Sequence, residues 1–130
     1  MSTALAARDL KVFLADDSAP IRQRVAGMLP PASTVVGEGG TPHECIAGIL
    51  ATRPDVVVLD VQLEGGQGLE VLRAVRAAQP HVAFVVLSNN SQPAYRKHYL
   101  AAGASRFLDK STEFDQLAAA VAAAPQTLSH

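Results

Sequence analysis

The sequence predicts an α/β fold: a single doubly wound parallel sheet of five strands, flanked by five helices. Two runs, residues 56–59 and 82–87, contain only apolar residues, which is typical of strands buried on both faces. Runs of this kind alternate along the chain with segments of helical periodicity. Because the connections between them are short, we expect right-handed crossovers that place helices on both faces of the sheet.

Length and composition are typical of one domain with a substantial core. The chain has 130 residues, of which 48% are hydrophobic and 18% charged. Its formal net charge of −1 gives no general attraction to nucleic acid or to an anionic membrane. No apolar stretch approaches the roughly 18 residues of a membrane span. The single cysteine, Cys45, cannot form an internal disulfide, so we expect a reducing, cytoplasmic location.

The first strand is expected at residues 11–15, after a leader at residues 1–10. It ends at an acidic pair, Asp16 and Asp17. Ser18 is a suitable N-cap for the helix that follows, because its hydroxyl can accept a hydrogen bond from a free backbone N–H of the first turn.

Residues 34–37 are expected to contain a short second strand, Val35–Val36. Thr41 and Glu44 then form a capping-box pattern that predicts the start of a second helix, which ends before Pro54. The central strand, residues 56–60, comes next and ends in a carboxylate.

The second half of the chain repeats this alternation. A loop is expected at residues 61–67, followed by a helix that begins at Gly68. After the strand at residues 82–87, a helix is expected to begin near Ser91 and to end at Gly103, since glycine favours the position just after a helix.

The last strand and helix complete the sheet. The strand is expected at residues 105–108, and Thr112 is expected to cap the helix that follows. Residues 125–130 are expected to form a tail.

Five polar side chains lie at or just after the ends of four expected strands: Asp16, Asp17, Asp60, Ser88 and Lys110. Since the carboxyl ends of parallel strands share one edge of a sheet, we expect these groups to converge. Three neighbouring carboxylates repel one another unless a cation joins them, and such oxygen-rich sites suit Mg²⁺. Lys110 can hold an anion, and Ser88 offers a hydroxyl donor. This combination fits phosphoryl transfer to Asp60 as nucleophile.

The same residues resemble those of the receiver domain of response regulators in two-component signalling. Each matching segment is weak alone, but together their order and spacing are specific. The resemblance covers residues 11–124 and implies a flavodoxin-like sheet with strand order 2-1-3-4-5. The matching segments are 12–17 (VFLADD), the strand that ends at Asp60, 68–70 (GLE), 87–88 (LS), 103–105 (GAS) and 107–110 (FLDK).

The resemblance implies a role for each of these residues. Asp60 would be the phosphoacceptor, with Ser88 and Lys110 in contact with the phosphoryl group. Ser88 and Phe107 would be the two switch residues, whose arrangement changes on phosphorylation. The implied ligands of Mg²⁺ are Asp16, Asp17, Asp60 and the backbone carbonyl of Gln62.

The implied function is a phosphorylatable signalling switch, phosphorylated by a histidine kinase or a phosphotransfer protein. It would act by protein contact through the face of the fourth helix, fifth strand and fifth helix, with no nucleic-acid or membrane binding expected. No second domain is visible, so a stand-alone receiver at residues 11–124 is expected. It would not be an enzyme beyond assisting its own phosphorylation and dephosphorylation.

Two alternatives differ in class. A phosphorylation-independent, receiver-like adaptor would not need the five polar groups, and labelling by acetyl phosphate separates it from a switch. An aspartate-nucleophile phosphohydrolase usually has a second acid two residues after the nucleophile, where this chain has Gln62. Release of phosphate from a model ester would identify a phosphohydrolase.

The chain also departs from the family pattern at three places. Leu63 and Glu64 stand where the family often has Met-Pro, and Asn89 stands where it usually has a small residue. Ser111 stands where the family often has a proline after a cis bond. Because a cis bond before a non-proline residue costs about 2.5–4 kcal/mol, we expect a trans bond here.

Overall fold

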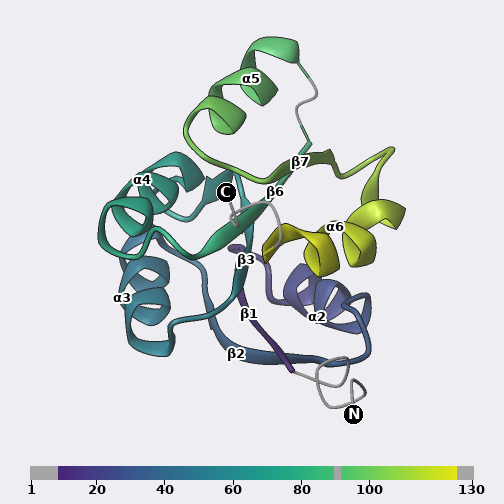
Figure 1. Ribbon diagram of the computed structural model, residues 1–130. Helices are drawn as coiled ribbons and strands as arrows, with labels where there is room; N and C mark the ends of the chain where they lie inside the picture. Colours follow the sequence, from purple (N-terminus) through teal and green to yellow (C-terminus); the bar gives the residue numbers. More distant parts are fainter. Residues whose placement is uncertain (1–8, 90–91, 126–130) are drawn as a thin grey trace.

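A parallel five-stranded sheet forms the centre of the protein, with helices on both of its faces (Figure 1). The computed structural model describes residues 9–89 and 92–125. The strand order is β2-β1-β3-β6-β7, which confirms the expected order 2-1-3-4-5 when the strands of this sheet are counted along the chain. The strands are β1 (Leu10–Ala15), β2 (Ser33–Gly39), β3 (Val56–Asp60), β6 (Ala83–Ser88) and β7 (Arg106–Asp109).

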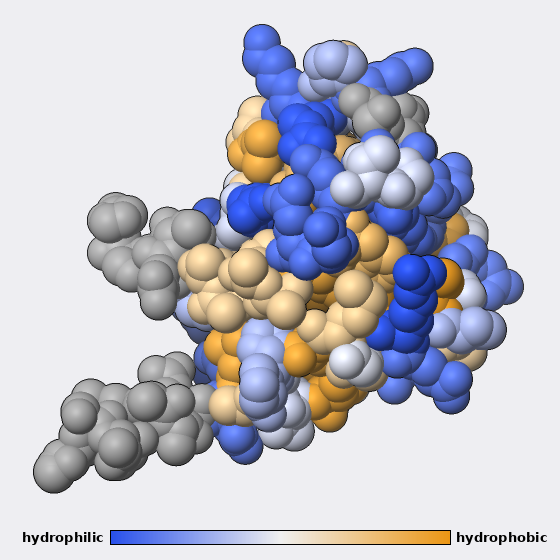
Figure 2. All heavy atoms as spheres, turned by 90° about the vertical axis from the view of Figure 1, so that its right-hand side faces the viewer, coloured by the Kyte–Doolittle hydropathy of each residue, from blue (hydrophilic) through white to orange (hydrophobic). Residues whose placement is uncertain are grey.

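Five α-helices lie in the described part of the chain: α2 (Ala19–Gly27), α3 (Pro42–Thr52), α4 (Gly68–Ala78), α5 (Pro93–Ala101) and α6 (Leu117–Ala123). Helices α2 and α6 cover one face of the sheet, and α3, α4 and α5 lie on the other. Figure 2 shows the side of α2 and α6, where weakly hydrophobic residues lie across the middle of the surface among hydrophilic ones. Helix α6 has exposed alanines at positions 119, 122 and 123.

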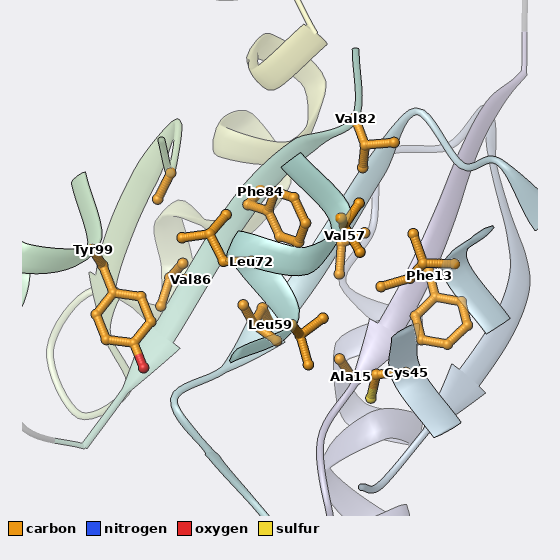
Figure 3. Packing of buried hydrophobic residues seen from close by; sticks show 14 of the residues in the cluster. Phe13, Ala15, Cys45, Val57, Leu59, Leu72, Val82, Phe84, Val86 and Tyr99 are labelled. Atoms are coloured by element: carbon orange, nitrogen blue, oxygen red, sulfur yellow. The ribbon is translucent and has the colours of Figure 1, made fainter. Parts of the chain in front are cut away.

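Two hydrophobic clusters fill the space between the sheet and the helices. Successive residues of a strand point to opposite faces. Phe13 therefore packs under α3 and α4, in the cluster drawn in Figure 3, whereas its neighbour Leu14 packs under α2 and α6. All five residues of β3 are buried, which explains why this strand has no polar residue before Asp60. The expectation of a doubly covered sheet is confirmed.

The predicted helix ends agree with the structure at several positions. The hydroxyl of Ser18 accepts a hydrogen bond from the N–H of Ile21 at 3.3 Å, and that of Thr41 accepts one from the N–H of Glu44 at 3.1 Å. After α5, Gly103 has a φ of +116°, a conformation that favours glycine.

Two expected features differ in the structure. Residues 61–67 contain a short antiparallel hairpin, β4 (Gln62–Leu63) with β5 (Gly66–Gln67), and Gly65 allows its turn with a φ of +81°. Thr112 does not cap the last helix, because the chain first forms a 3₁₀ turn, η1 (Phe114–Gln116), which leads into α6. Ser91 lies outside the described residues, and α5 begins at Pro93.

No peptide bond among the described residues is cis, so the bond between Lys110 and Ser111 is trans, as expected. Within residues 9–89 and 92–125, no helix has the length and apolar character needed to cross a membrane.

Candidate functional site

Strand register brings the predicted polar residues to one edge of the sheet. Asp60, the last residue of β3, pairs with Leu87 of β6, and Ser88 pairs with Asp109 of β7. Lys110 follows directly, and its backbone N–H donates to the carbonyl of Ser88 at 2.8 Å. Groups from distant parts of the chain therefore meet because parallel strands end together.

Three carboxylates and one ammonium group form the centre of this edge. Asp16, Asp17 and Asp60 each offer an oxygen, and these oxygens lie within 4.8 Å of one another. The Nζ of Lys110 lies 3.0 Å from Oδ2 of Asp60 and 3.4 Å from Oδ2 of Asp16. Asp16 and Asp60 are 5% and 7% exposed, so solvent screens their negative charges poorly.

Backbone N–H groups orient two of these carboxylates. Oδ1 of Asp16 accepts from the N–H of Ser18 at 2.9 Å, and Oδ1 of Asp60 accepts from the N–H of Gln62 at 3.3 Å.

The single ammonium group of Lys110 does not balance the negative charge of the three carboxylates. A cluster of oxygen donors with excess negative charge fits a hard divalent cation such as Mg²⁺.

Burial raises the pKa of Asp60 to about 6, from an ordinary value of 3.8. The positive charge of Lys110 acts in the opposite direction, and the nearby carboxylate of Asp16 raises the pKa further. A cation bound beside Asp60 would favour its ionised form. Without such a cation, the folded protein bears a cost for ionising Asp60 at neutral pH, because its pKa is raised to about 6.

Two adjoining cavities open over these groups. The first has a volume of about 370 Å³ and is lined by all three acidic residues, Gln62 and Lys110. The second has a volume of about 260 Å³ and is lined by Asp60, Gln62, Ser88 and Asn89, among others. Ser88 is fully buried and faces the second cavity. Asp60 lines both cavities, with Lys110 in the lining of the first and Ser88 in that of the second.

Phe107 does not line either cavity. It is 1% exposed and packs behind the edge, with its ring centroid 5.8 Å from that of Tyr99 and 6.5 Å from that of Tyr95. The guanidinium of Arg96 lies 5.2 Å from the centre of the Phe107 ring. The structure therefore brings six of the predicted site residues together and places Phe107 between the edge and α5.

Several residues near the site were not singled out from the sequence. Arg22 donates from Nη1 to the backbone carbonyl of Asp16, and from Nε to Glu38 at 2.7 Å. Arg24 stacks over the ring of Phe114 at 4.7 Å, and both line the first cavity. No motif or periodicity indicates these contacts, since they join residues of α2 to other elements and turns far along the chain.

The response regulator receiver domain model matches residues 12–122 of this chain. The chain belongs to this family. Its relatives include the DNA-binding transcriptional activator DevR/DosR of Mycobacterium tuberculosis, 36% identical over 114 residues, a match that covers 86% of this chain and 52% of DevR/DosR. The transcriptional regulatory protein YxjL of Bacillus subtilis is 32% identical over 117 residues, which cover 88% of this chain and 54% of YxjL.

A solved structure of a response regulator has the same fold. A two-component response regulator of the LuxR family from Aurantimonas sp. SI85-9A1 has a TM-score of 0.84 and 26% identity, over 92% of this chain and 86% of that one. The chain spans about half the length of DevR/DosR and of YxjL. The receiver domain is thus the shared part.

Proposed function

We propose that this receiver domain is switched by phosphorylation of Asp60. The donor would be a histidine kinase or a phosphotransfer protein. An oxygen of Asp60 would form a bond to phosphorus while the bond between phosphorus and the donor's imidazole nitrogen breaks, and the imidazole leaves. The observation that supports this proposal best is the 3.0 Å contact between Lys110 Nζ and a buried Asp60 carboxylate that is open to a cavity.

The other site residues have separate parts in this proposal. The ammonium of Lys110 would neutralise negative charge on the transferring group, and the hydroxyl of Ser88 would donate a hydrogen bond to a phosphoryl oxygen. Mg²⁺ would be held by Asp16, Asp17, Asp60 and the backbone carbonyl of Gln62. When bound, it would supply positive charge that offsets the repulsion between the carboxylates and the incoming phosphoryl group.

We further propose that residues 11–124 form the receiver domain. It would catalyse no reaction other than its own phosphorylation and dephosphorylation at Asp60. The output would pass to a downstream protein through the face of α5, β7 and α6. A hollow of about 510 Å³ on α5 supports this choice, because the 41% exposed Leu100 lines it together with Arg96 and Lys97. An apolar side chain beside two cations is suited to an acidic, partly apolar protein surface.

Intact-mass analysis after incubation with acetyl phosphate and Mg²⁺ tests the proposal. The wild-type protein should gain one phosphoryl group, and a chelator should prevent the gain. The Asp60→Ala variant should gain none, whereas Asp115→Ala, which removes an exposed acid of η1, should label like the wild type. Equal labelling of Asp60→Ala would show that the phosphoacceptor lies elsewhere.

A further inference from the structure

Lys110 lies at the start of a turn that reverses the chain after β7. Its ammonium group reaches Asp60 and Asp16, and its backbone N–H is fixed by the carbonyl of Ser88. Ser111, on the other side, has no ring to restrict the backbone, unlike the proline often found there in the family. The backbone after Lys110 must therefore be held by other contacts.

The carboxylate of Asp109 makes one such set of contacts. Its Oδ1 accepts from the backbone N–H of Ser111 at 2.8 Å and from the hydroxyl of Ser111 at 2.6 Å. These two hydrogen bonds span Lys110, because they join the residue before it to the residue after it. Asp109 is only 6% exposed, so the bonds are shielded from water and, being charge-assisted, are stronger than neutral ones.

The carboxylate of Glu113 closes the same turn from the other end. Its Oε1 accepts from the backbone N–H of Asp109 at 2.9 Å, and its own N–H donates to the carbonyl of Asp109 at 2.8 Å. Oε1 also accepts from Nη2 of Arg96 at 3.0 Å, which links the turn to α5. The hydrogen bond from Asp109 and the contact with Arg96 hold the pKa of Glu113 below its usual value, so it is ionised at neutral pH.

We propose that Asp109 and Glu113 are positioning residues for Lys110. Their carboxylates hold the turn at residues 109–113 in the conformation that directs the Lys110 ammonium at Asp60, and so replace the restraint of a proline. Neither carboxylate would touch the phosphoryl group. The inference rests on the proposed function, since the role of Lys110 in phosphoryl transfer is part of it.

A double-mutant cycle on the phosphorylation rate tests the inference. The initial rate with acetyl phosphate at saturating Mg²⁺ would be measured for Asp109→Ala, for Lys110→Ala and for both together. A misplaced catalytic group commonly costs tenfold or more, so Asp109→Ala should slow the wild type about tenfold. In the Lys110→Ala background it should change the rate by less than about twofold, because no ammonium remains to position.

Three further variants sharpen the result. Asp109→Asn retains an acceptor oxygen and should recover most of the rate. Glu113→Ala should slow phosphorylation in the same Lys110-dependent way, whereas the matched control Asp115→Ala should not. Affinity for Mg²⁺, followed by NMR titration, should be unchanged in Asp109→Ala, because the proposed Mg²⁺ ligands are left in place.

Two outcomes would overturn the inference. One is an equal rate loss with and without Lys110, which would mean that Asp109 supports the fold in general. The other is a wild-type rate in both Asp109→Ala and Glu113→Ala. If Asp109→Ala does not fold, Ser111→Ala, which removes one of the two hydrogen bonds, should still show a smaller, Lys110-dependent loss, and its absence would contradict the inference. Absence of wild-type labelling would instead refute the proposed function itself.

Discussion

At Asp60, burial and Lys110 act on the carboxylate in opposite directions, and burial has the larger effect. The pKa is raised from 3.8 to about 6, so at neutral pH the folded protein ionises this group at a cost that the unfolded chain does not have. The contribution of Asp60 to the free energy of unfolding is therefore fully present below about pH 4, where the carboxyl is protonated in both states. It is lost as the pH rises through about 6. Removing the charge should relieve this cost.

We accordingly expect Asp60→Asn to stabilise the metal-free protein at pH 7.5 by about 1–3 kcal/mol, since one pKa unit corresponds to about 1.4 kcal/mol. At pH 4 the two proteins should be nearly equal in stability, because wild-type Asp60 is then protonated. Urea unfolding in the presence of a chelator measures the difference. A gain that is the same at both pH values would show that charge is not its cause.

Asn89 lies near Asp60, at the cavities that open over the site. Its side chain lines both cavities and is larger than the small residue usual in the family. If it obstructs the water that attacks the phosphoryl group, Asn89→Ala should shorten the lifetime of phosphorylated Asp60 several-fold. The decay of the phosphorylated mass after removal of acetyl phosphate gives this lifetime. An unchanged or longer lifetime would argue against obstruction.

At the scale of elements, the start of α4 depends on one glycine. A Cβ added at Gly68 would lie 2.5 Å from the backbone carbonyl oxygen of Asp60 and 3.1 Å from the side chain of Leu59. Helix α4 can therefore begin against the end of β3 only without a side chain at this position. Gly68→Ala should shift the helix or the strand and destabilise the protein by about 1–3 kcal/mol.

A matched control is Gly27, the last residue of α2, where an added Cβ would meet nothing within 4 Å. Gly27→Ala should stabilise the protein by about 0.5–1 kcal/mol, because alanine favours the helix and restricts the unfolded chain. Urea unfolding of both variants gives the comparison. Equal stability of Gly68→Ala and the wild type would mean that β3 and α4 tolerate a wider separation.

The elements that could be predicted from the sequence are those with strong periodicity or a continuous apolar run. Strand β3 was predicted with its observed bounds, because burial on both faces removes polar residues from it. The edge strand β2 extends beyond residues 34–37, because most of its residues are only half-buried and its pattern is weak. The hairpin of β4 and β5 could not be predicted, since each strand has two residues and no period.

At the scale of the whole molecule, the convergence of the site could be predicted because it follows from topology alone. Any parallel sheet with this strand order brings Asp60 and Lys110 to one edge. Contacts that involve loops could not be predicted in this way. The bond from Arg22 to the carbonyl of Asp16 and the turn closed by Glu113 depend on loop conformations that no sequence period specifies.

The last prediction concerns how a change at Asp60 reaches the α5 surface. Phe107 is buried between β7 and α5, against Tyr95 and Tyr99, so a change in its position requires α5 to adjust. Tyr99 is the one buried residue of α5, so little burial of apolar surface anchors this helix to the sheet. A hydroxyl of Ser88 drawn toward a phosphoryl oxygen would open space next to Phe107 and favour a second arrangement.

Amide NMR shifts with and without beryllofluoride, a mimic of the aspartyl phosphate, measure this response. We expect changes across residues 93–107 as well as around Asp60 and Lys110. In Ser88→Ala the changes around Asp60 should persist, because the mimic still binds there, whereas those across α5 should shrink, because the hydroxyl that couples them is gone. Changes confined to the loops of the site in the wild type would mean that Phe107 is an ordinary core residue and that α5 does not report phosphorylation.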